Sequence, residues 1–432
     1  MRITIIALFN KPFVRNVIAV ATGTALAQFI AIILSPIITR LYGPESFGVL
    51  GIFSGIIHIF APIFALTYPI AIVLPKGDIE AKGIASLSLL ISLISGLLSS
   101  IVVFFLKEEI LSWLKISSIG NLIYLAPISC VLWTLKDVMN QWFIRCGRFK
   151  VIAIITFVNA IIVNFLMIVW GFFSSSGSNL VLLTVLSYGI HGISLAFLLL
   201  QGRNEPWCKL SEVHFENSPN LQYLLILAKK YFDFPFYRTP QTLINRISQG
   251  IPVLALGAFW GASSAGFYTL GLKVLGIPSL LISKSVGDVL YPRLAQAVEN
   301  KEEIRKMIVK SILTLVVIGF VPYLVIVFWG PQLFSIFFGK DWFDAGRYAQ
   351  WLALWQFSSF VSMPSLISLP VLKKQGILLI HEIFITLLRL SSILLGGFYF
   401  QNGVITVALF SVIGLIANVL VVFYSLASKM KA

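Results

Sequence analysis

The run from Tyr231 to Pro292 has the sequence YFDFPFYRTPQTLINRISQGIPVLALGAFWGASSAGFYTLGLKVLGIPSLLISKSVGDVLYP. It predicts two apolar helices, at about 235–259 and 266–290, and the flanking segments are also apolar over about the 20 residues that a bilayer-spanning helix needs. Both helices nevertheless carry charges, which are Arg238, Arg246, Lys273, Lys284 and Asp288. A cation near the bilayer centre costs about 2.5–3.5 kcal/mol on insertion scales. These cations therefore need a hydrated cavity lined by protein, and we place the functional site there.

The first of these helices carries a polar face. At 100° per residue, one side of it collects Arg238, Gln241, Thr242, Asn245 and Gln249, with Arg246 at the edge. In the second helix Lys273 and Lys284 are nearly in line, and Asp288 follows Lys284 by one turn. We expect the four cations to converge on one aqueous space near mid-depth in the membrane.

The composition is that of a membrane protein. The chain has 432 residues, of which 58% are hydrophobic and 11% charged, and its mean hydropathy is +0.94. A soluble globular domain is about half apolar and a quarter charged. The net charge of +15 would suggest a nucleic-acid partner in a soluble protein. Here most basic residues fall in short loops, as in the cytoplasmic loops of membrane proteins, so we expect no nucleic acid.

Twelve hydrophobic segments are long enough to span a bilayer. They lie near 17–38, 47–74, 84–106, 120–143, 151–173, 180–200, 235–259, 266–290, 307–329, 347–371, 377–398 and 403–426. With a cytoplasmic N-terminus, basic residues concentrate in the cytoplasmic turns and tails, and the opposite loops carry only Arg40, Lys107, Lys115, Lys340 and Arg347. This asymmetry sets the orientation. The sequence predicts an all-α polytopic membrane protein with about twelve transmembrane helices and both termini in the cytoplasm.

The two halves of the chain resemble each other at two places. LYGPESFG at 41–48 aligns with FWGASSAG at 259–266, at the turn between the first and second helix of each half. LPK at 74–76 aligns with YPR at 291–293, at nearly the same offset and at the end of the next helix. Six helices is an even number, so the two copies have one orientation and are related by a pseudo-two-fold axis along the membrane normal. We expect six-helix lobes at 1–200 and 231–432, with the substrate site near the midplane between them.

Residues 201–230 form the long polar connection between these lobes. Ser218-Pro219 is typical of a helix N-terminus, and apolar residues then follow at helical spacing up to Lys229 and Lys230. Two interpretations remain open, a short interfacial helix on the cytoplasmic membrane surface or an inward extension of the seventh span.

Further charges lie in the fourth and eleventh spans. Lys136 and Asp137 are adjacent in the fourth, and Glu382 and Arg389 share one face of the eleventh. For Glu382 with Arg389, and for Lys284 with Asp288, the alternative to a binding site is an ion pair that joins helices. The predicted substrate-binding residues are Arg238, Asn245, Arg246, Lys273, Lys284, Lys136 and Arg389, and the predicted pathway or ion-pair residues are Asp137, Asp288, Glu382, Gln241 and Gln249. Deep cations outnumber deep acids, so the expected guest is an anion.

Motifs for catalysis are missing from the sequence. It contains no Walker loop, HExxH, GxSxG or acidic ligand cluster. Cys130, Cys146 and Cys208 lack metal-ligand spacing and are predicted to be reduced thiols. We therefore expect a transporter without catalytic residues, metal or cofactor.

The chain resembles the O-antigen and lipid-linked oligosaccharide flippases of the polysaccharide biosynthesis family, within the multidrug/oligosaccharidyl-lipid/polysaccharide exporter superfamily. The resemblance rests on PIITRLYGPESFG at 36–48, on the turn RCGRFK at 145–150 and on the twelve-span plan, which covers nearly the whole chain. It implies two lobes around a central cleft that opens alternately to cytoplasm and periplasm. It also implies basic residues in the cleft and a location in the bacterial inner membrane.

The substrate that the resemblance implies is an oligosaccharide on undecaprenyl pyrophosphate, moved outward across that membrane. Arg and Lys suit the diphosphate, and Asn, Gln and Ser suit sugar hydroxyls. The expected partners are this lipid-linked oligosaccharide, membrane lipids and other membrane proteins of polysaccharide assembly. Two alternatives are a cation-coupled drug exporter of the same superfamily, which needs acids facing its cargo, and a membrane polymerase or ligase, which needs a larger outer loop.

Overall fold

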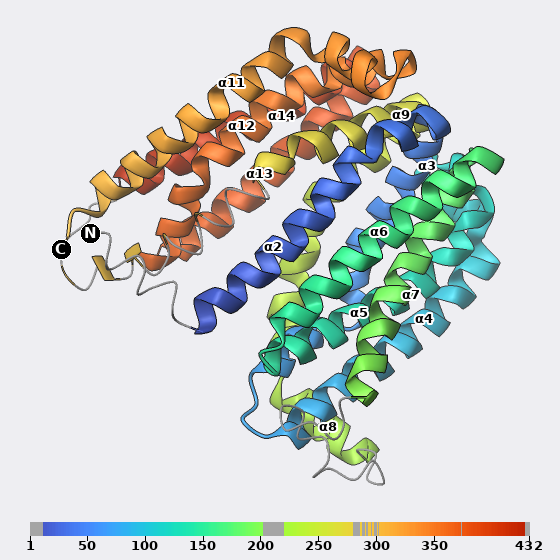
Figure 1. The fold of residues 1–432 in the computed structure, drawn as a ribbon, viewed down its shortest axis with the longest axis vertical. Coiled ribbons are helices and arrows are strands. Elements are labelled where there is room, and N and C mark those ends of the chain that lie inside the picture. The colour runs from blue at the N-terminus through green and yellow to red at the C-terminus, as the bar shows by residue number, and fades with distance from the viewer. Residues whose placement is uncertain are drawn as a thin grey trace. The chain divides into compact units, whose positions relative to one another are not determined.

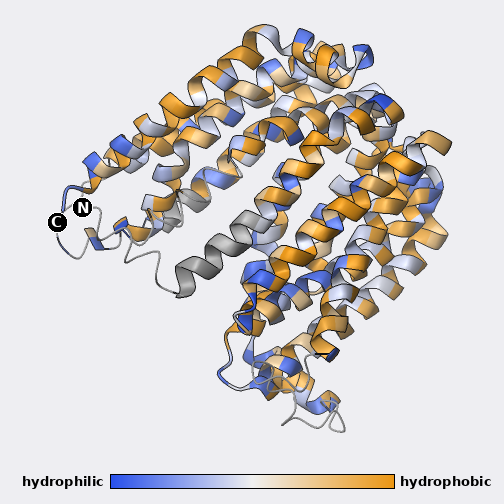
Figure 2. Ribbon diagram, viewed as in Figure 1, coloured by the Kyte–Doolittle hydropathy of each residue, from blue (hydrophilic) through white to orange (hydrophobic). Residues whose placement is uncertain are grey.

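The computed structural model describes residues 12–201, 220–279, 302–372 and 374–427, with isolated residues at 286, 290, 293, 294, 296, 297 and 300. This part of the chain contains helices and no strand. Ten helices or joined helical runs within it are long and apolar enough to cross a membrane. Figure 2 shows that their ribbons are mostly hydrophobic, with short hydrophilic stretches. The chain is therefore an all-α multi-pass membrane protein, as predicted.

The helices form two compact units. The first unit comprises Met1–Leu34 and Ile52–Gly250, and the second comprises Ser35–Gly51 and Ile251–Ala432. The boundaries pass through two long helices, α3 (Ser35–Phe64) and α9 (Thr239–Leu275), so that each unit contains part of both. The six-helix lobes at 1–200 and 231–432, with their linker, stay a prediction.

Five long helices pack side by side in the first unit (Figure 1). They are α2 (Pro12–Ile33), α4 (Asp78–Leu114), α5 (Leu125–Arg145), α6 (Phe149–Phe173) and α7 (Gly177–Gln201). Helix α2 packs on α6, α6 on α7, α7 on α5, and α5 on α4. The short 3-10 helices η1 (Tyr68–Val73) and η2 (Ser117–Tyr124) precede α4 and α5. Each of the five long helices coincides with one expected span.

The second expected span is shorter than predicted. Helix α3 ends at Phe64 instead of near residue 74, because Leu66 and Thr67 have φ values of 48° and 54° and the separate helix η1 begins at Tyr68, with Pro69 in its first turn. Left-handed φ values interrupt an α-helix and are strained for a β-branched residue such as Thr. The Thr67 hydroxyl is buried and hydrogen-bonds the Thr239 hydroxyl at 3.1 Å. The interruption therefore lies against the start of α9.

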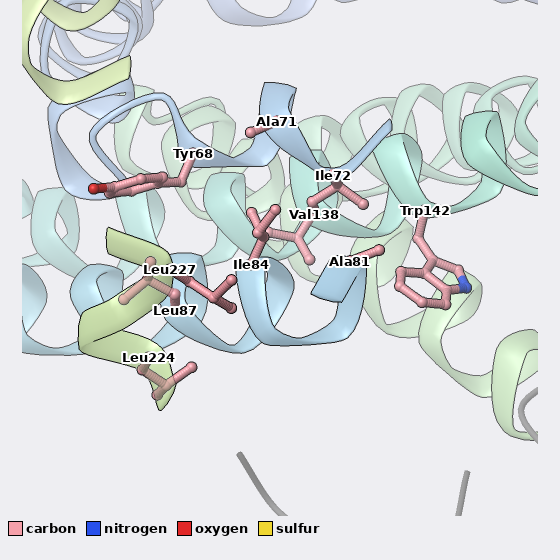
Figure 3. Close-up of a cluster of buried hydrophobic side chains, with 10 residues drawn as sticks. All are labelled: Tyr68, Ala71, Ile72, Ala81, Ile84, Leu87, Val138, Trp142, Leu224 and Leu227. Atoms are coloured by element: carbon pink, nitrogen blue, oxygen red, sulfur yellow. The ribbon is translucent and has the colours of Figure 1, made fainter. Parts of the chain in front are cut away.

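A buried apolar cluster fixes the segment after the polar connection to the first unit (Figure 3). Its members are Tyr68, Ala71, Ile72, Ala81, Ile84, Leu87, Val138, Trp142, Leu224 and Leu227. Leu224 and Leu227 belong to α8 (Leu221–Lys230), and the others come from η1, α4 and α5. The Tyr68 hydroxyl donates to the Ala228 carbonyl at 3.1 Å. Because the backbone leaves the helical region at Tyr231, α8 is a separate helix packed on α4 and not an extension of the seventh span.

The second unit is built around four further helices. They are α11 (Ile304–Phe338), α12 (Phe343–Val371), α13 (Gln375–Leu395) and α14 (Gly403–Ala427). Helix α12 packs on α11 and α14, and α13 packs on α14. The short helix η7 (Lys340–Trp342) precedes α12, and the π-helical turn η8 (Gly396–Phe400) follows α13. These helices coincide with the last four expected spans.

The backbone confirms the internal repeat at its first matching site. Gly43 in α3 has φ 68° and ψ 173°, and Gly261 in α9 has φ 82° and ψ 174°. Glycine adopts positive φ without steric cost, unlike other residues. Both copies thus turn from one helix into the next with the same residue type in the same conformation. The second match pairs residues 74–76 with residues 291–293. Of the latter, Tyr291 and Pro292 lie outside the described residues, so the structure does not test this match.

The helices that follow these two turns are in close contact within the second unit. A Cβ added to Gly48 would lie 1.7 Å from the Ala262 carbonyl oxygen, and one added to Gly266 would lie 2.0 Å from the Pro44 carbonyl oxygen. In the repeat Pro44 corresponds to Ala262, and Gly48 corresponds to Gly266. The two contacts are therefore one contact repeated by the two copies, as a local two-fold axis requires.

Candidate functional site

The polar face predicted for residues 238–249 is present on the first-unit part of α9. Arg238, Gln241, Asn245 and Gln249 are all exposed. Arg238 Nη1 donates to Gln241 Oε1 at 3.2 Å, and Gln249 Nε2 donates to Asn245 Oδ1 at 2.8 Å. These bonds confirm that the side chains share a face. Lipid could not satisfy the remaining polar atoms, so this face requires water or a polar guest.

A π-helical turn positions Arg238. The turn η5 (Phe234–Arg238) leads into α9, and π-helical turns inside α-helices are frequent at functional sites. The hydroxyl oxygens of Thr67 and Thr239 each lie 3.2 Å from the Phe234 carbonyl oxygen and 3.1 Å from each other. Each hydroxyl has one proton, so at least one of them donates to this carbonyl. The sequence held one signal for this turn, since Pro240 has no N–H to donate to the preceding helical turn. Arg238 therefore ends an irregular segment that is anchored on both sides.

A second charged group lies in the same unit, on α5 and α9. Asp137 is within electrostatic range of Lys136 beside it and of Arg246. Lys136 Nζ lies 4.5 Å from the centroid of the Trp133 ring and 5.6 Å from that of Tyr188. A cation over aromatic faces gains a cation–π attraction but keeps its hydrogen-bond donors free for another partner.

Two histidines, His58 and His191, complete this group, and they are not among the site residues predicted from the sequence. His58 on α3 is exposed, packs edge-on against Trp133 at 5.3 Å between ring centroids, and is within electrostatic range of Arg246. His191 on α7 hydrogen-bonds Asn140 Oδ1 at 3.2 Å. One signal was available, because residues 133, 136 and 140 share one face of a helix. The histidines themselves come from other helices, and no local pattern joins them to that face.

The deep cations differ from other charged residues in their pairing. The ion pairs in the described part of the chain lie near helix ends, and they are Lys107–Glu108, Arg145–Asp78, Lys230–Glu80, Arg293–Glu302, Lys306–Glu303 and Arg347–Asp344. Among the described residues no ion pair is formed by Lys136, Arg238, Arg246, Lys273 or Arg389. The ion pair between Glu382 and Arg389, the alternative to a site, is thus not formed.

Lys273 and Arg389 belong to the second unit. Lys273 is partly buried on the second-unit part of α9, and Arg389 lies on α13 within electrostatic range of Glu382. Lys284 and Asp288 lie outside the described residues. The convergence of Arg238, Arg246, Lys273 and Lys284 on one aqueous space stays a prediction.

The described residues contain no metal site and no disulfide. No group of three His, Cys, Asp or Glu side chains in the described ranges could hold a metal ion. Cys130 and Cys146 form no disulfide there, and Cys208 is not among the described residues.

Comparison with known proteins places the chain in a family. The model of the family described as "Polysaccharide biosynthesis protein" matches residues 37–347. The chain belongs to this family. It is 22% identical over 286 residues to an uncharacterized membrane protein in the cps region of Klebsiella pneumoniae, covering 66% of this chain and 56% of that protein.

Two transport and biosynthesis proteins are also similar. The succinoglycan biosynthesis transport protein ExoT of Rhizobium meliloti (strain 1021) is 24% identical over 299 residues, which are 68% of this chain and 56% of ExoT. The lipopolysaccharide biosynthesis protein WzxC of Escherichia coli (strain K12) is 26% identical over 102 residues, 24% of this chain and 21% of WzxC. The matches thus span little more than half the length of these relatives at most.

Solved structures show the same fold. The lipid II flippase MurJ in an inward closed conformation has a TM-score of 0.70 at 15% identity, with 95% of this chain and 87% of MurJ covered. An inward-facing multidrug resistance MATE family transporter of the MOP superfamily has a TM-score of 0.67 at 17% identity, with 92% and 93% covered. At these identities the likeness establishes the fold, and the expected two-lobed plan of about twelve helices is consistent with it.

Proposed function

We propose that the protein is a flippase for an oligosaccharide linked to undecaprenyl pyrophosphate. It moves this substrate, an O-antigen or similar surface polysaccharide repeat unit, from the cytoplasmic to the periplasmic leaflet of a bacterial inner membrane by alternating access. The observation that carries the proposal is the net positive surface of the first unit, where Lys136, Arg238 and Arg246 lie within membrane-spanning helices and form no direct ion pair among the described residues. Membership of a polysaccharide biosynthesis family and the fold shared with MurJ support it.

The chemistry of this surface suits a glycolipid diphosphate. A guanidinium presents a rigid fork of donors that matches two phosphate oxygens, whereas a lysine ammonium attracts phosphate as a point charge. The exposed amides of Gln241, Asn245 and Gln249 can donate to and accept from sugar hydroxyls. Asp137 offsets part of the positive potential around Lys136 and Arg246, so a bound anion can also leave. An inside-negative potential favours the outward step by about 2.3 kcal/mol per charge per 100 mV.

A cation-coupled drug exporter is the second candidate, because MATE transporters share the fold. Such an exporter needs acids that face a cationic cargo. The acid in the described group, Asp137, is flanked by Lys136 and Arg246. A cationic drug would meet a net positive surface there, and this charge balance favours the flippase.

Deletion of the gene in its host tests the proposal. We expect lipid-linked repeat units to accumulate in the cytoplasmic leaflet and surface polysaccharide to fall, with both restored by the wild-type gene on a plasmid. Susceptibility to cationic drugs should not change. Normal surface polysaccharide together with increased drug susceptibility would reject the flippase and support the exporter.

A further inference from the structure

Arg389 occupies an aromatic site in the second unit. Its guanidinium carbon lies 5.0 Å from the centroid of the Trp355 ring on α12 and 5.2 Å from that of the Phe410 ring on α14. The two rings meet edge to face at 5.1 Å. Aromatic contact holds the planar guanidinium in place but uses none of its hydrogen-bond donors, because the attraction is to the ring faces.

Arg389 and two residues near it in the fold or along α13 carry buried hydrogen-bonding groups without a protein partner. Arg389 Nε itself is buried and has none. Tyr268 on α9 is 2% exposed, its hydroxyl has no hydrogen-bond partner, and it lies within electrostatic range of Arg389. Thr386, one turn before Arg389 on α13, is 7% exposed and its hydroxyl also lacks a partner. Buried polar groups are normally hydrogen-bonded, so an unpartnered guanidinium nitrogen together with two unpartnered hydroxyls on neighbouring residues indicates a ligand.

The chemistry of the three groups selects the class of ligand. A guanidinium has five donors and no acceptor, and hydroxyls can each donate once. The ligand must therefore supply several acceptor oxygens. Glu382, which precedes Arg389 by two turns, is within electrostatic range but forms no ion pair with it in the described structure. No acid therefore contacts the Arg389 guanidinium directly in the described structure, and an anionic ligand can take that place.

We propose that Arg389, Tyr268 and Thr386 form an oxyanion-binding subsite in the second unit. The Arg389 guanidinium binds two oxygens of a phosphate or carboxylate, and the two hydroxyls donate to the same group. The source of the oxyanion rests on the proposed function. It is either the diphosphate of the lipid carrier or the carboxylate of an acidic sugar in the glycan, and the two sources call for different probes.

Calorimetric titration of the purified full-length chain tests the subsite. The background protein carries K136Q, R238Q and R246Q, which remove the cations of the first-unit surface. Inorganic pyrophosphate represents the lipid carrier, glucuronate an acidic sugar, and glucose a neutral one. We expect at least one anion to bind and glucose not to bind. In the same background R389Q should abolish that binding, R389K should retain part of it, and Y268F should weaken it about tenfold.

The control variant is Y323F in the same background. Tyr323 is equally buried, but its hydroxyl donates to the Leu275 carbonyl at 3.0 Å. Y323F should therefore lose thermal stability and keep its anion affinity. Y268F should show the opposite pattern, because removal of a hydroxyl without a partner does not weaken the folded protein. If Tyr268 had only a structural role, Y268F would lose thermal stability, as Y323F is expected to.

Two outcomes would overturn the subsite. One is failure of both anions to bind the folded background protein, and the other is equal affinity in the background, Y268F and R389Q proteins. Binding of pyrophosphate alone identifies the lipid carrier as the source, and binding of glucuronate alone identifies an acidic sugar. The titration measures binding of free anions and not transport. The subsite can therefore be confirmed or rejected independently of whether the protein proves to be a flippase in cells.

Discussion

At the scale of single residues, the site combines one position that the sequence predicts with one that only the fold assembles. Arg238 lies on a stripe that helical spacing alone identifies, and the structure shows the stripe exposed. Asp137 and Arg246 are more than 100 residues apart in the chain, and their electrostatic contact depends on how α5 and α9 pack. Local periodicity carries no information about that packing, so the pair was not predicted.

Arg238 should respond to charge in a graded way. R238K should keep part of the export activity, because an ammonium still attracts phosphate. R238A should lose most of it, and R238E should lose all of it, since a like charge repels the diphosphate. The measurement is surface polysaccharide in the deletion strain complemented with each variant, normalised to membrane protein level.

The matched control for Arg238 is R347A. Arg347 is an exposed arginine near the start of α12 that pairs with Asp344, and we expect near wild-type export from this variant. Export by R238E at the wild-type rate and at equal abundance would show that Arg238 does not contact the diphosphate.

Asp137 should stabilise the protein through its two neighbouring cations. D137N leaves the partly buried Lys136 and Arg246 without a compensating acid, and removal of one partner from a partly buried charge group is destabilising. We expect a lower unfolding temperature in detergent for D137N, with recovery in the double variant K136Q/D137N. D344N, which breaks an exposed pair, should change stability by about 0–1 kcal/mol. An unfolding temperature of K136Q/D137N as low as that of D137N would show that Asp137 does not stabilise the protein by offsetting the charge of Lys136.

At the scale of helices, the repeat was predictable and the irregularities were not. The match of 41–48 with 259–266 predicted equivalent turns, and Gly43 and Gly261 have nearly the same φ and ψ. The early end of α3 depends on the left-handed residues Leu66 and Thr67, and hydrogen bonds from the Thr67 hydroxyl connect this end to the π-helical turn at Phe234–Arg238 and to Thr239. The sequence at the end of α3 is apolar on both sides of Thr67, so hydropathy does not reveal that break, and Pro240 was the local signal for the π-helical turn.

The glycine contact between the repeats should tolerate no side chain. In G266A the new Cβ would meet the Pro44 carbonyl oxygen at 2.0 Å, and a backbone oxygen cannot move aside without displacing its helix. We expect a loss of about 1–3 kcal/mol in stability, as for other overpacked sites, measured as a lower unfolding temperature in detergent.

Gly189 provides the matched control for this contact. A Cβ at Gly189 in α7 would lie 3.6 Å from a Leu132 methyl carbon, which is an ordinary contact. G189A should therefore leave stability unchanged or raise it by up to about 1 kcal/mol, because Ala favours a helix over Gly. Equal unfolding temperatures for G266A and the wild-type protein would mean that the two helices do not pack as described.

At the scale of the whole molecule, hydropathy predicted the class of protein and most of the spans. Their orientation follows from the distribution of Lys and Arg and stays a prediction. How residues of different spans combine could not be predicted, since many arrangements of twelve apolar helices bury similar area. This explains why the polar stripe on α9 was found from the sequence, while the roles of His58 and His191 were not.

The orientation predicts which faces are accessible to a membrane-impermeant thiol reagent. In a background with Cys130, Cys146 and Cys208 replaced by Ser, K229C in α8 should be labelled only from the cytoplasm, and E45C only from outside. Both positions are exposed, so burial does not limit labelling. Labelling of both from the same side of the membrane would contradict the six-plus-six topology.

Transport in reconstituted vesicles is the most direct measurement of the central claim. Purified protein is placed in liposomes that contain undecaprenyl-pyrophosphate-linked oligosaccharide, and a membrane-impermeant glycosidase reports how much of the substrate reaches the outer leaflet over time. We predict that wild-type and R347A protein make nearly all of the substrate accessible, and that R238E leaves it at the level of protein-free liposomes. Wild-type vesicles that behave like protein-free liposomes, or R238E vesicles that behave like wild type, would contradict the account.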